Sequence, residues 1–307
     1  MSFIIETNQL TRRYRDFVAV DALDLCVPTG SVYGFLGPNG AGKTTTIRML
    51  LGLITPSAGG IQLFSQPMTA KDRRSALRRV GALVEMPSLY PHLTGRQNLE
   101  VTRRLLEVPV NRIDHVLALV KLREVAGKRV REYSLGMKQR LGIALALLGQ
   151  PDLLILDEPT NGLDPAGIHE VRDLIRTLPG ELGITIFLSS HLLSEVEQIA
   201  THIGVINKGK LLFQGTLGAL QAQHPAELRI GTRQPSAALE WLAKQHWSVE
   251  SRDKALYVRS VNQADAAHIN KGLIQAGLDV FHLTLEQPTL EQIFLQLTQQ
   301  SGSESAQ

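Results

Sequence analysis

The chain has 307 residues, of which 43% are hydrophobic and 20% are charged. This length suits two or three domains, and the apolar content excludes a disordered chain. The single cysteine, Cys26, excludes an internal disulfide, and its strand-like surroundings favour a core position over a nucleophile. No apolar run approaches the ~18 residues of a membrane-spanning helix, and we expect no signal peptide at the start.

The net charge of +3 is unevenly distributed. Of 32 Lys and Arg and 29 Asp and Glu, 7 and 9 lie from residue 225 onward, which leaves 25 and 20 before it. The excess includes Arg73, Arg74, Arg78 and Arg79. Such a surface could serve a membrane-side partner or nucleic acid, although a solvated helix face is the more frequent explanation.

Residues 2–36 are expected to form short strands joined by turns. Tyr14 lies among them in a basic turn, where the residue pattern alone assigns it no function. A glycine-rich loop follows the apolar run 32–36 and precedes a helix-compatible run. Its residues are Gly37, Pro38, Asn39, Gly40, Ala41, Gly42, Lys43, Thr44 and Thr45.

This loop has the strand–loop–helix setting of a phosphate-binding loop. Glycines let the backbone approach an anion closely, and the N–H groups at the following helix start attract it. Lys43 is placed to reach the β- and γ-phosphates, and Thr44 to bind Mg²⁺ through its hydroxyl. The sequence therefore predicts binding of a nucleoside triphosphate.

Between the loop and residue 150 the pattern changes from strands to helices. A strand over 80–84 ends at Glu85, and residues 86–150 contain helical patterns, the first of them capped by Thr94. This indicates a helical insertion between two strands of one sheet.

Two further strands end in polar residues. The apolar run 153–156 ends at Asp157 and Glu158, as a buried parallel strand that delivers carboxylates would. Asp157 can hold the Mg²⁺ hydration shell, and Glu158 can polarise an attacking water. The strand 184–188 leads to His191, which could sense a γ-phosphate by hydrogen bonding.

From about residue 225 the pattern restarts as β-α-β-β-α-β, the order of the ferredoxin-like arrangement. The expected elements are strand 227–231, helix 236–246, strands 247–251 and 255–260, helix 262–276, strand 279–284 and an amphipathic helix 289–299. No catalytic pattern occurs there, which favours a regulatory or interaction module.

One segment separates classes of phosphate-loop proteins: Tyr133-Ser134-Leu135-Gly136-Met137-Lys138-Gln139-Arg140. It aligns with the LSGGQ signature of ABC proteins and the following Gln-Arg, and it ends 17 residues before Asp157. Residues 1–220 therefore resemble the nucleotide-binding subunit of an ABC transporter. A GTPase is disfavoured because Lys210 stands where a guanine-reading aspartate is needed.

The resemblance implies an α/β phosphate-loop NTPase fold of the ABC type over 1–224, with a helical subdomain at about 86–150. A ferredoxin-like α+β domain over 225–300 and a disordered tail over 301–307 complete the expected organisation.

It also implies that two copies pair head to tail around two ATP molecules. Ser134 and Gly136 of one copy would face the γ-phosphate held by the other, and Asp164 would lie at the dimer contact. His191 matches the family's switch histidine, and Tyr14 matches the aromatic residue that stacks on adenine.

Two departures from the family pattern stand out. Leu135 and Met137 replace the usual glycine and glutamine of the signature, and Glu85 stands where most members carry a glutamine that contacts Mg²⁺. The segment from Glu85 to Thr94 is similar to that of bacitracin-export and lantibiotic-immunity ATPases, although other ABC-2 exporters share this glutamate. In either group this segment should bind the cytoplasmic helix of a membrane subunit.

The resemblance thus implies an Mg²⁺-dependent ATPase with Glu158, His191 and Lys43 as catalytic residues. It would be cytoplasmic and peripheral on the inner face of the membrane, where it would dock on separate permease subunits and drive export, with no nucleic acid as partner. The alternatives are a ribosome- or DNA-directed ABC ATPase and a cassette that binds ATP as a non-transport switch. Against the first, the chain has one cassette and no long coiled-coil insertion.

Overall fold

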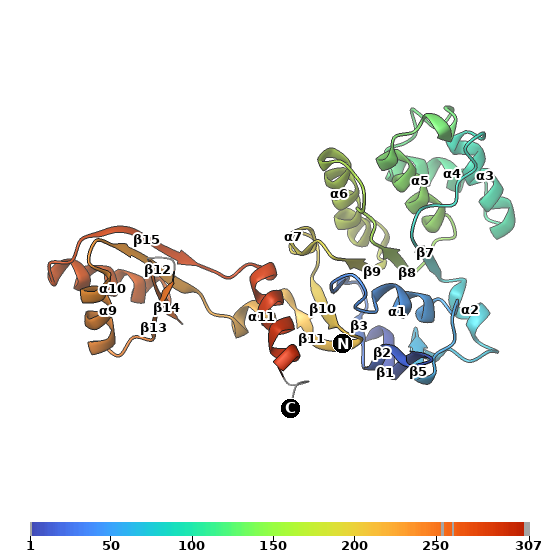
Figure 1. The fold of residues 1–307 in the computed structure, drawn as a ribbon. Coiled ribbons are helices and arrows are strands. Elements are labelled where there is room, and N and C mark those ends of the chain that lie inside the picture. Colours follow the sequence, from blue (N-terminus) through green and yellow to red (C-terminus); the bar gives the residue numbers. More distant parts are fainter. Residues whose placement is uncertain (1, 253–254, 260, 304–307) are drawn as a thin grey trace. The chain divides into compact units, whose positions relative to one another are not determined.

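A computed structural model describes residues 2–252, 255–259 and 261–303 (Figure 1). The chain divides into two compact units, with the boundary between Leu217 and Gly218. This boundary falls at the start of α8 (Leu217–Gln223), whereas the sequence placed it after residue 224. Among the described residues, no helix has the length and apolar character needed to cross a bilayer.

The first unit mixes strands and helices. Its strands are β1 (Phe3–Tyr14), β2 (Phe17–Leu23), β3 (Cys26–Pro28), β4 (Val32–Leu36), β5 (Ala58–Leu63), β6 (Gln66–Pro67), β7 (Val80–Leu83), β8 (Leu153–Asp157), β9 (Thr185–Ser190), β10 (His202–Asn207) and β11 (Lys210–Thr216). Its helices are α1 (Lys43–Leu50), α2 (Arg73–Leu77), α3 (Gly95–Leu106), α4 (Asn111–Leu119), α5 (Leu135–Leu147), α6 (Pro165–Leu182) and α7 (Leu193–Val196), with a 3₁₀ turn at Val130–Glu132.

A six-stranded sheet in the order β11-β10-β4-β9-β8-β7 positions the loop and the strand ends. All neighbours from β10 to β7 are parallel, and only β11 is antiparallel to its partner. Every residue of β4, β8 and β9 is buried, which explains their unbroken apolar runs. Because parallel strands end at one edge, the residues after β4, β8 and β9 meet there.

The second sheet of this unit carries the N-terminal strands in the order β2-β1-β5-β6, with β3 also pairing with β1. Both sheets contribute to one core, in which Phe187 stacks on Tyr33 at a centroid distance of 5.6 Å. Cys26 lies on β3 and is half-buried, outside the core position that the sequence favoured, and burial raises its pKa.

The helical insertion lies between β7 and β8, which are neighbours in the sheet. Figure 1 shows α3, α4 and α5 gathered beyond β7. The N-cap expected at Thr94 is present, because its hydroxyl accepts the Gln97 N–H at 3.1 Å and the Gln97 side chain returns to the Thr94 N–H. A Cβ on Gly142 of α5 would lie 2.7 Å from the Cβ of Pro87, so this helix packs directly against the segment that follows Glu85.

The second unit is an α+β arrangement. Its elements are β12 (Glu227–Thr232), α9 (Pro235–Lys244), β13 (Val249–Arg252), β14 (Ala255–Arg259), α10 (Gln263–Gln275), β15 (Val280–Glu286) and α11 (Leu290–Ser303). The four strands are antiparallel in the order β13-β14-β12-β15. A separate core with Ile230, Leu242 and Ile269 holds the sheet and two helices together.

Helix α11 continues to Ser303, three residues into the segment 301–307 that was expected to be disordered. The helix therefore ends later than its composition suggested, since adding a residue to a formed helix is far easier than starting one. Residues 304–307 lie outside the described residues.

The aromatic stack predicts a large stability loss at Phe187. Replacing this fully buried ring by alanine should lower the unfolding free energy of the first unit by about 3–5 kcal/mol, because it leaves a cavity beneath Tyr33 and Phe35. Urea unfolding followed by far-UV circular dichroism measures the change. The matched control is Leu105→Ala, at a side chain that is 79% exposed, and equal loss in both variants would contradict the prediction.

Candidate active site

The glycine-rich loop connects β4 to α1 as the sequence predicts. Gly42 is the N-cap of α1 with φ +109°, and a Cβ there would lie 2.5 Å from the carbonyl oxygen of Ala19. Only glycine meets both requirements. No side chain caps α1, so the N–H groups of its first turn are not taken up by a capping side chain. The loop thus presents the features of an anion site.

Lys43 lies at the start of α1 and is only 6% exposed. Its ammonium donates to the carbonyl oxygens of Gly37, at 2.7 Å, and Pro38, at 3.3 Å. It also lies 3.2 Å from a carboxylate oxygen of Glu158. A buried cation needs such oxygen partners, and these three satisfy the Lys43 ammonium.

The carboxylate of Glu158 contacts both the phosphate loop and the residues that follow β9. One carboxylate oxygen faces Lys43, and the other lies 2.7 Å from Nδ1 of His191 and accepts the His191 backbone N–H at 3.3 Å. Glu158 has φ +49°, a conformation uncommon for a residue with a side chain. The structure therefore brings Lys43, Glu158 and His191 into one cluster.

Ser189 supports this cluster, and the sequence reasoning did not identify it. Its hydroxyl donates to Asp157 at 2.5 Å and accepts the Glu158 N–H at 3.0 Å. Asp157 is 3% exposed and pairs with Ser189 across β8 and β9. The sequence did contain one signal for this role: Ser189 lies at the end of an apolar strand, as Asp157 does.

The three expected magnesium ligands have different surroundings. Thr44 is half-buried on the first turn of α1, and Asp157 lies at the end of β8. Glu85 is exposed with φ +61°, and its carboxylate forms an ion pair with Arg48 of α1. Among the described residues, no group of three or more His, Cys, Asp or Glu is placed to hold a metal.

Hydroxyl and carboxylate oxygens are the donors that Mg²⁺ prefers, and Mg²⁺ is commonly bound by one or two protein groups together with substrate phosphates. Thr44 and Asp157 fit this chemistry as they stand. Glu85 fits by residue type, but its carboxylate is held by Arg48.

The signature residues Ser134 and Gly136 lie at the start of α5, next to Asp164 at the start of α6. Ser134 is the N-cap of α5 and accepts the Met137 N–H at 3.2 Å, and Asp164 is the N-cap of α6 and accepts the Gly167 N–H at 3.0 Å. A Cβ on Gly136 would lie 3.5 Å from Gly167, so the two helix starts are adjacent. In the described part of the chain, neither cap has a hydrogen bond to the phosphate loop.

Tyr14 ends β1 and is 43% exposed. The guanidinium of Arg12 lies over its ring, 4.5 Å from the centroid. Nearly half of the side chain thus remains accessible beside this contact.

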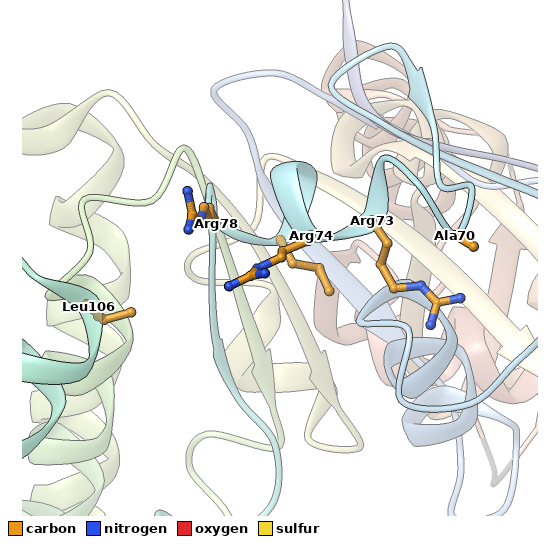
Figure 2. Close-up of a pocket in the computed structure, with 6 residues that line it drawn as sticks. Ala70, Arg73, Arg74, Arg78 and Leu106 are labelled. Atoms are coloured by element: carbon orange, nitrogen blue, oxygen red, sulfur yellow. The ribbon is translucent and has the colours of Figure 1, made fainter.

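A basic groove of about 520 Å³ lies between α2 and the end of α3 (Figure 2). Arg73 points away from Leu106 and donates to the Gly52 carbonyl at 3.4 Å, whereas Arg74 extends toward Leu106. Within the described residues, Arg74 and Arg78 have no ion-pair partner, while Arg79 is paired with Asp152 at 2.6 Å. Part of the positive excess thus lines a groove.

Comparisons with known proteins identify the family of this chain. Residues 20–161 match the ABC transporter family. A bacitracin transport ATP-binding protein of Bacillus licheniformis is 45% identical over 302 residues, 97% of this chain and 98% of that protein. A lantibiotic transport ATP-binding protein of Streptococcus pyogenes is 41% identical over 69% of this chain and 90% of its own length. The solved structure of cbiO1 from Clostridium perfringens, part of an ABC transporter complex, covers 73% of this chain and 92% of its own, with a TM-score of 0.67 and 28% identity.

The hydrogen bonds of Ser189 predict a stability loss on Ser189→Ala. Both Asp157 and the Glu158 N–H would lose their partner in a buried place, which should cost about 2 kcal/mol of unfolding free energy in the first unit. Urea unfolding measures this cost against Ser194→Ala, an exposed serine nearby in the chain. Identical midpoints for the two variants would show that the Ser189 hydroxyl does not stabilise this strand end.

Proposed function

The chain belongs to the ABC transporter family and is the ATP-binding and ATP-hydrolysing subunit of an export system, and we propose that it drives separate membrane subunits that export peptide antibiotics. The cargo class follows the names of the relatives that transport bacitracin and lantibiotics. The observation that carries the activity is the cluster of Lys43, Glu158 and His191 at the phosphate loop.

The geometry supports a role for Glu158 as the base. Its carboxylate stands at the mouth of the loop and is bound on one side by Lys43 and on the other by His191. When ATP enters, its phosphate oxygens are the stronger partners for the ammonium, and Lys43 exchanges Glu158 for them. The freed carboxylate oxygen then accepts a proton from water that attacks the γ-phosphorus, while the bond from that phosphorus to the bridging oxygen breaks and ADP leaves.

His191 keeps this carboxylate in position through its second oxygen. The ring contact at 2.7 Å and the backbone N–H at 3.3 Å both hold Oε2, which leaves Oε1 for the water. The imidazole thereby lies beside the γ-phosphate, where its hydrogen bonds depend on whether that phosphate is present.

The remaining loop residues bind rather than react. The phosphates are proposed to lie on Gly37, Pro38, Asn39, Gly40, Ala41, Gly42, Thr44 and Thr45, with adenine on Tyr14. Thr44 and Asp157 would hold Mg²⁺, joined by Glu85 if it leaves Arg48. When bound, this ion neutralises charge on the phosphate oxygens.

Two copies are proposed to pair head to tail. Ser134 and Gly136 lie at the start of α5, where a hydroxyl and backbone N–H groups would bind an anion. Asp164 lies beside them at the start of α6. The γ-phosphate held by the second copy would complete this site.

The membrane subunits are proposed to dock on the segment after Glu85 and on the end of α3. Met86, Tyr90 and Leu105 are large apolar side chains that are 58%, 51% and 79% exposed. Large apolar side chains exposed on these two segments favour contact with a partner helix. The subunit would then lie on the cytoplasmic face of the membrane.

A soluble ABC-type ATPase that acts as a non-transport switch is less favoured. The relatives that cover nearly the whole chain include transport ATP-binding proteins, and all three expected catalytic residues are present and clustered.

Glu158→Gln tests the role of the base. The amide cannot accept the proton, so ATP turnover should fall at least about 100-fold while ATP binding persists and ATP-dependent dimers accumulate. Steady-state phosphate release and size-exclusion chromatography with ATP measure the two effects. Glu181→Gln on α6 is the control. Turnover at the wild-type level in Glu158→Gln would remove Glu158 from the mechanism.

Leu105→Asp tests the docking surface. A charge in an apolar interface should reduce recovery of the chain with its co-expressed membrane subunits at least about 10-fold, without changing turnover of the isolated chain. Co-purification from detergent measures recovery, and Phe17→Asp is a control at an equally apolar, exposed residue outside this surface. Equal recovery of both variants would move the docking site elsewhere.

A further inference from the structure

One face of the Tyr14 ring lies against a cation. The guanidinium carbon of Arg12 lies 4.5 Å from the ring centroid, at the distance of a cation–π contact. Tyr14 itself is 43% exposed at the end of β1, next to a turn in which Arg15 has φ +50°. Without a contact of this kind, such a terminal side chain would sample several rotamers.

The guanidinium of Arg12 is itself held in place by the turn that follows α1. Its Nη1 donates to the carbonyl oxygen of Thr55 at 2.7 Å, in the turn that follows α1. The same turn is joined to β1 by the Ser57 N–H, which donates to the Thr11 carbonyl at 2.8 Å. The Nε of Arg12 is buried and has no hydrogen-bond partner among the described residues, so the guanidinium is held by the Thr55 carbonyl and the Tyr14 ring.

We propose that Arg12 is a positioning residue for adenine: it fixes the Tyr14 ring so that its free face is already oriented for the base. This inference rests on the proposed stacking of adenine on Tyr14. The base then forms the third layer of a guanidinium–phenol–purine stack. Because the ring is ordered before ATP arrives, its loss of rotamer freedom does not reduce the free energy of ATP binding.

The rival role for Arg12 is a direct contact with phosphate. Its engagement with Thr55 argues against this, since the guanidinium would have to leave a carbonyl and an aromatic face to reach an anion. The two roles make opposite predictions for a ligand that has phosphates but no base.

The experiment compares ATP with inorganic tripolyphosphate by isothermal titration calorimetry on the full chain. In Arg12→Ala, ATP should bind about three- to five-fold more weakly and tripolyphosphate with unchanged affinity, the size of a lost cation–π contact. Arg12→Lys keeps the charge and should recover part of the ATP affinity. In turnover assays, KM for ATP should rise with kcat unchanged. Arg13→Ala is the matched control, because Arg13 is exposed and its side chain has no hydrogen bond or ion pair among the described residues.

If Arg12→Ala weakens the binding of ATP and of tripolyphosphate equally, the proposal is overturned in favour of a phosphate contact. Equal ATP affinities of Arg12→Ala and Arg13→Ala would also overturn it. The double variant Arg12→Ala, Tyr14→Ala should bind ATP no more weakly than Tyr14→Ala alone, and additive losses would contradict the coupling. If Tyr14→Ala leaves ATP affinity unchanged, it is the proposed adenine site that fails, and Arg12→Ala then shows separately whether Arg12 acts on the nucleotide.

Discussion

The parallel pairing of β4, β9 and β8 determines where Lys43, Glu158 and His191 lie. Since β9 lies between the strand that enters the phosphate loop and the strand that ends in Asp157, the residues after all three strands meet at one sheet edge. Lys43, Glu158 and His191 come from three separate places in the sequence and contact each other only for this reason. A slip of one residue between β8 and β9 would turn the side chains of one strand to the opposite face and separate them.

Motifs whose residue pattern permits few structures could be predicted from the sequence. The glycine loop with its lysine predicted the phosphate loop between β4 and α1, and the acids after four apolar residues predicted the end of β8. The β-α-β-β-α-β order of the second unit was also predicted. The partners of these residues were not readable. The contacts of Glu158 with Lys43, of Ser189 with Asp157 and of Glu85 with Arg48 depend on strand register and on rotamers, which no local pattern encodes.

The contrast between Glu85 and Asp157 illustrates this limit. Both acids end apolar strands, and by residue type they suit the same ion. Asp157 is 3% exposed and fixed by Ser189, whereas Glu85 is exposed and paired with Arg48. The sequence shows where carboxylates are placed along the chain, but only the fold shows which of them is already committed to another partner.

The close approach of Gly142 to Pro87 has a mechanical consequence. With no side chain between the helix backbone and the proline ring, α5 and the chain after Glu85 are in direct contact. Helix α5 begins beside Ser134, and the chain after Glu85 carries the exposed side chains Met86 and Tyr90. A tilt of α5 would therefore press on the segment that bears these apolar side chains.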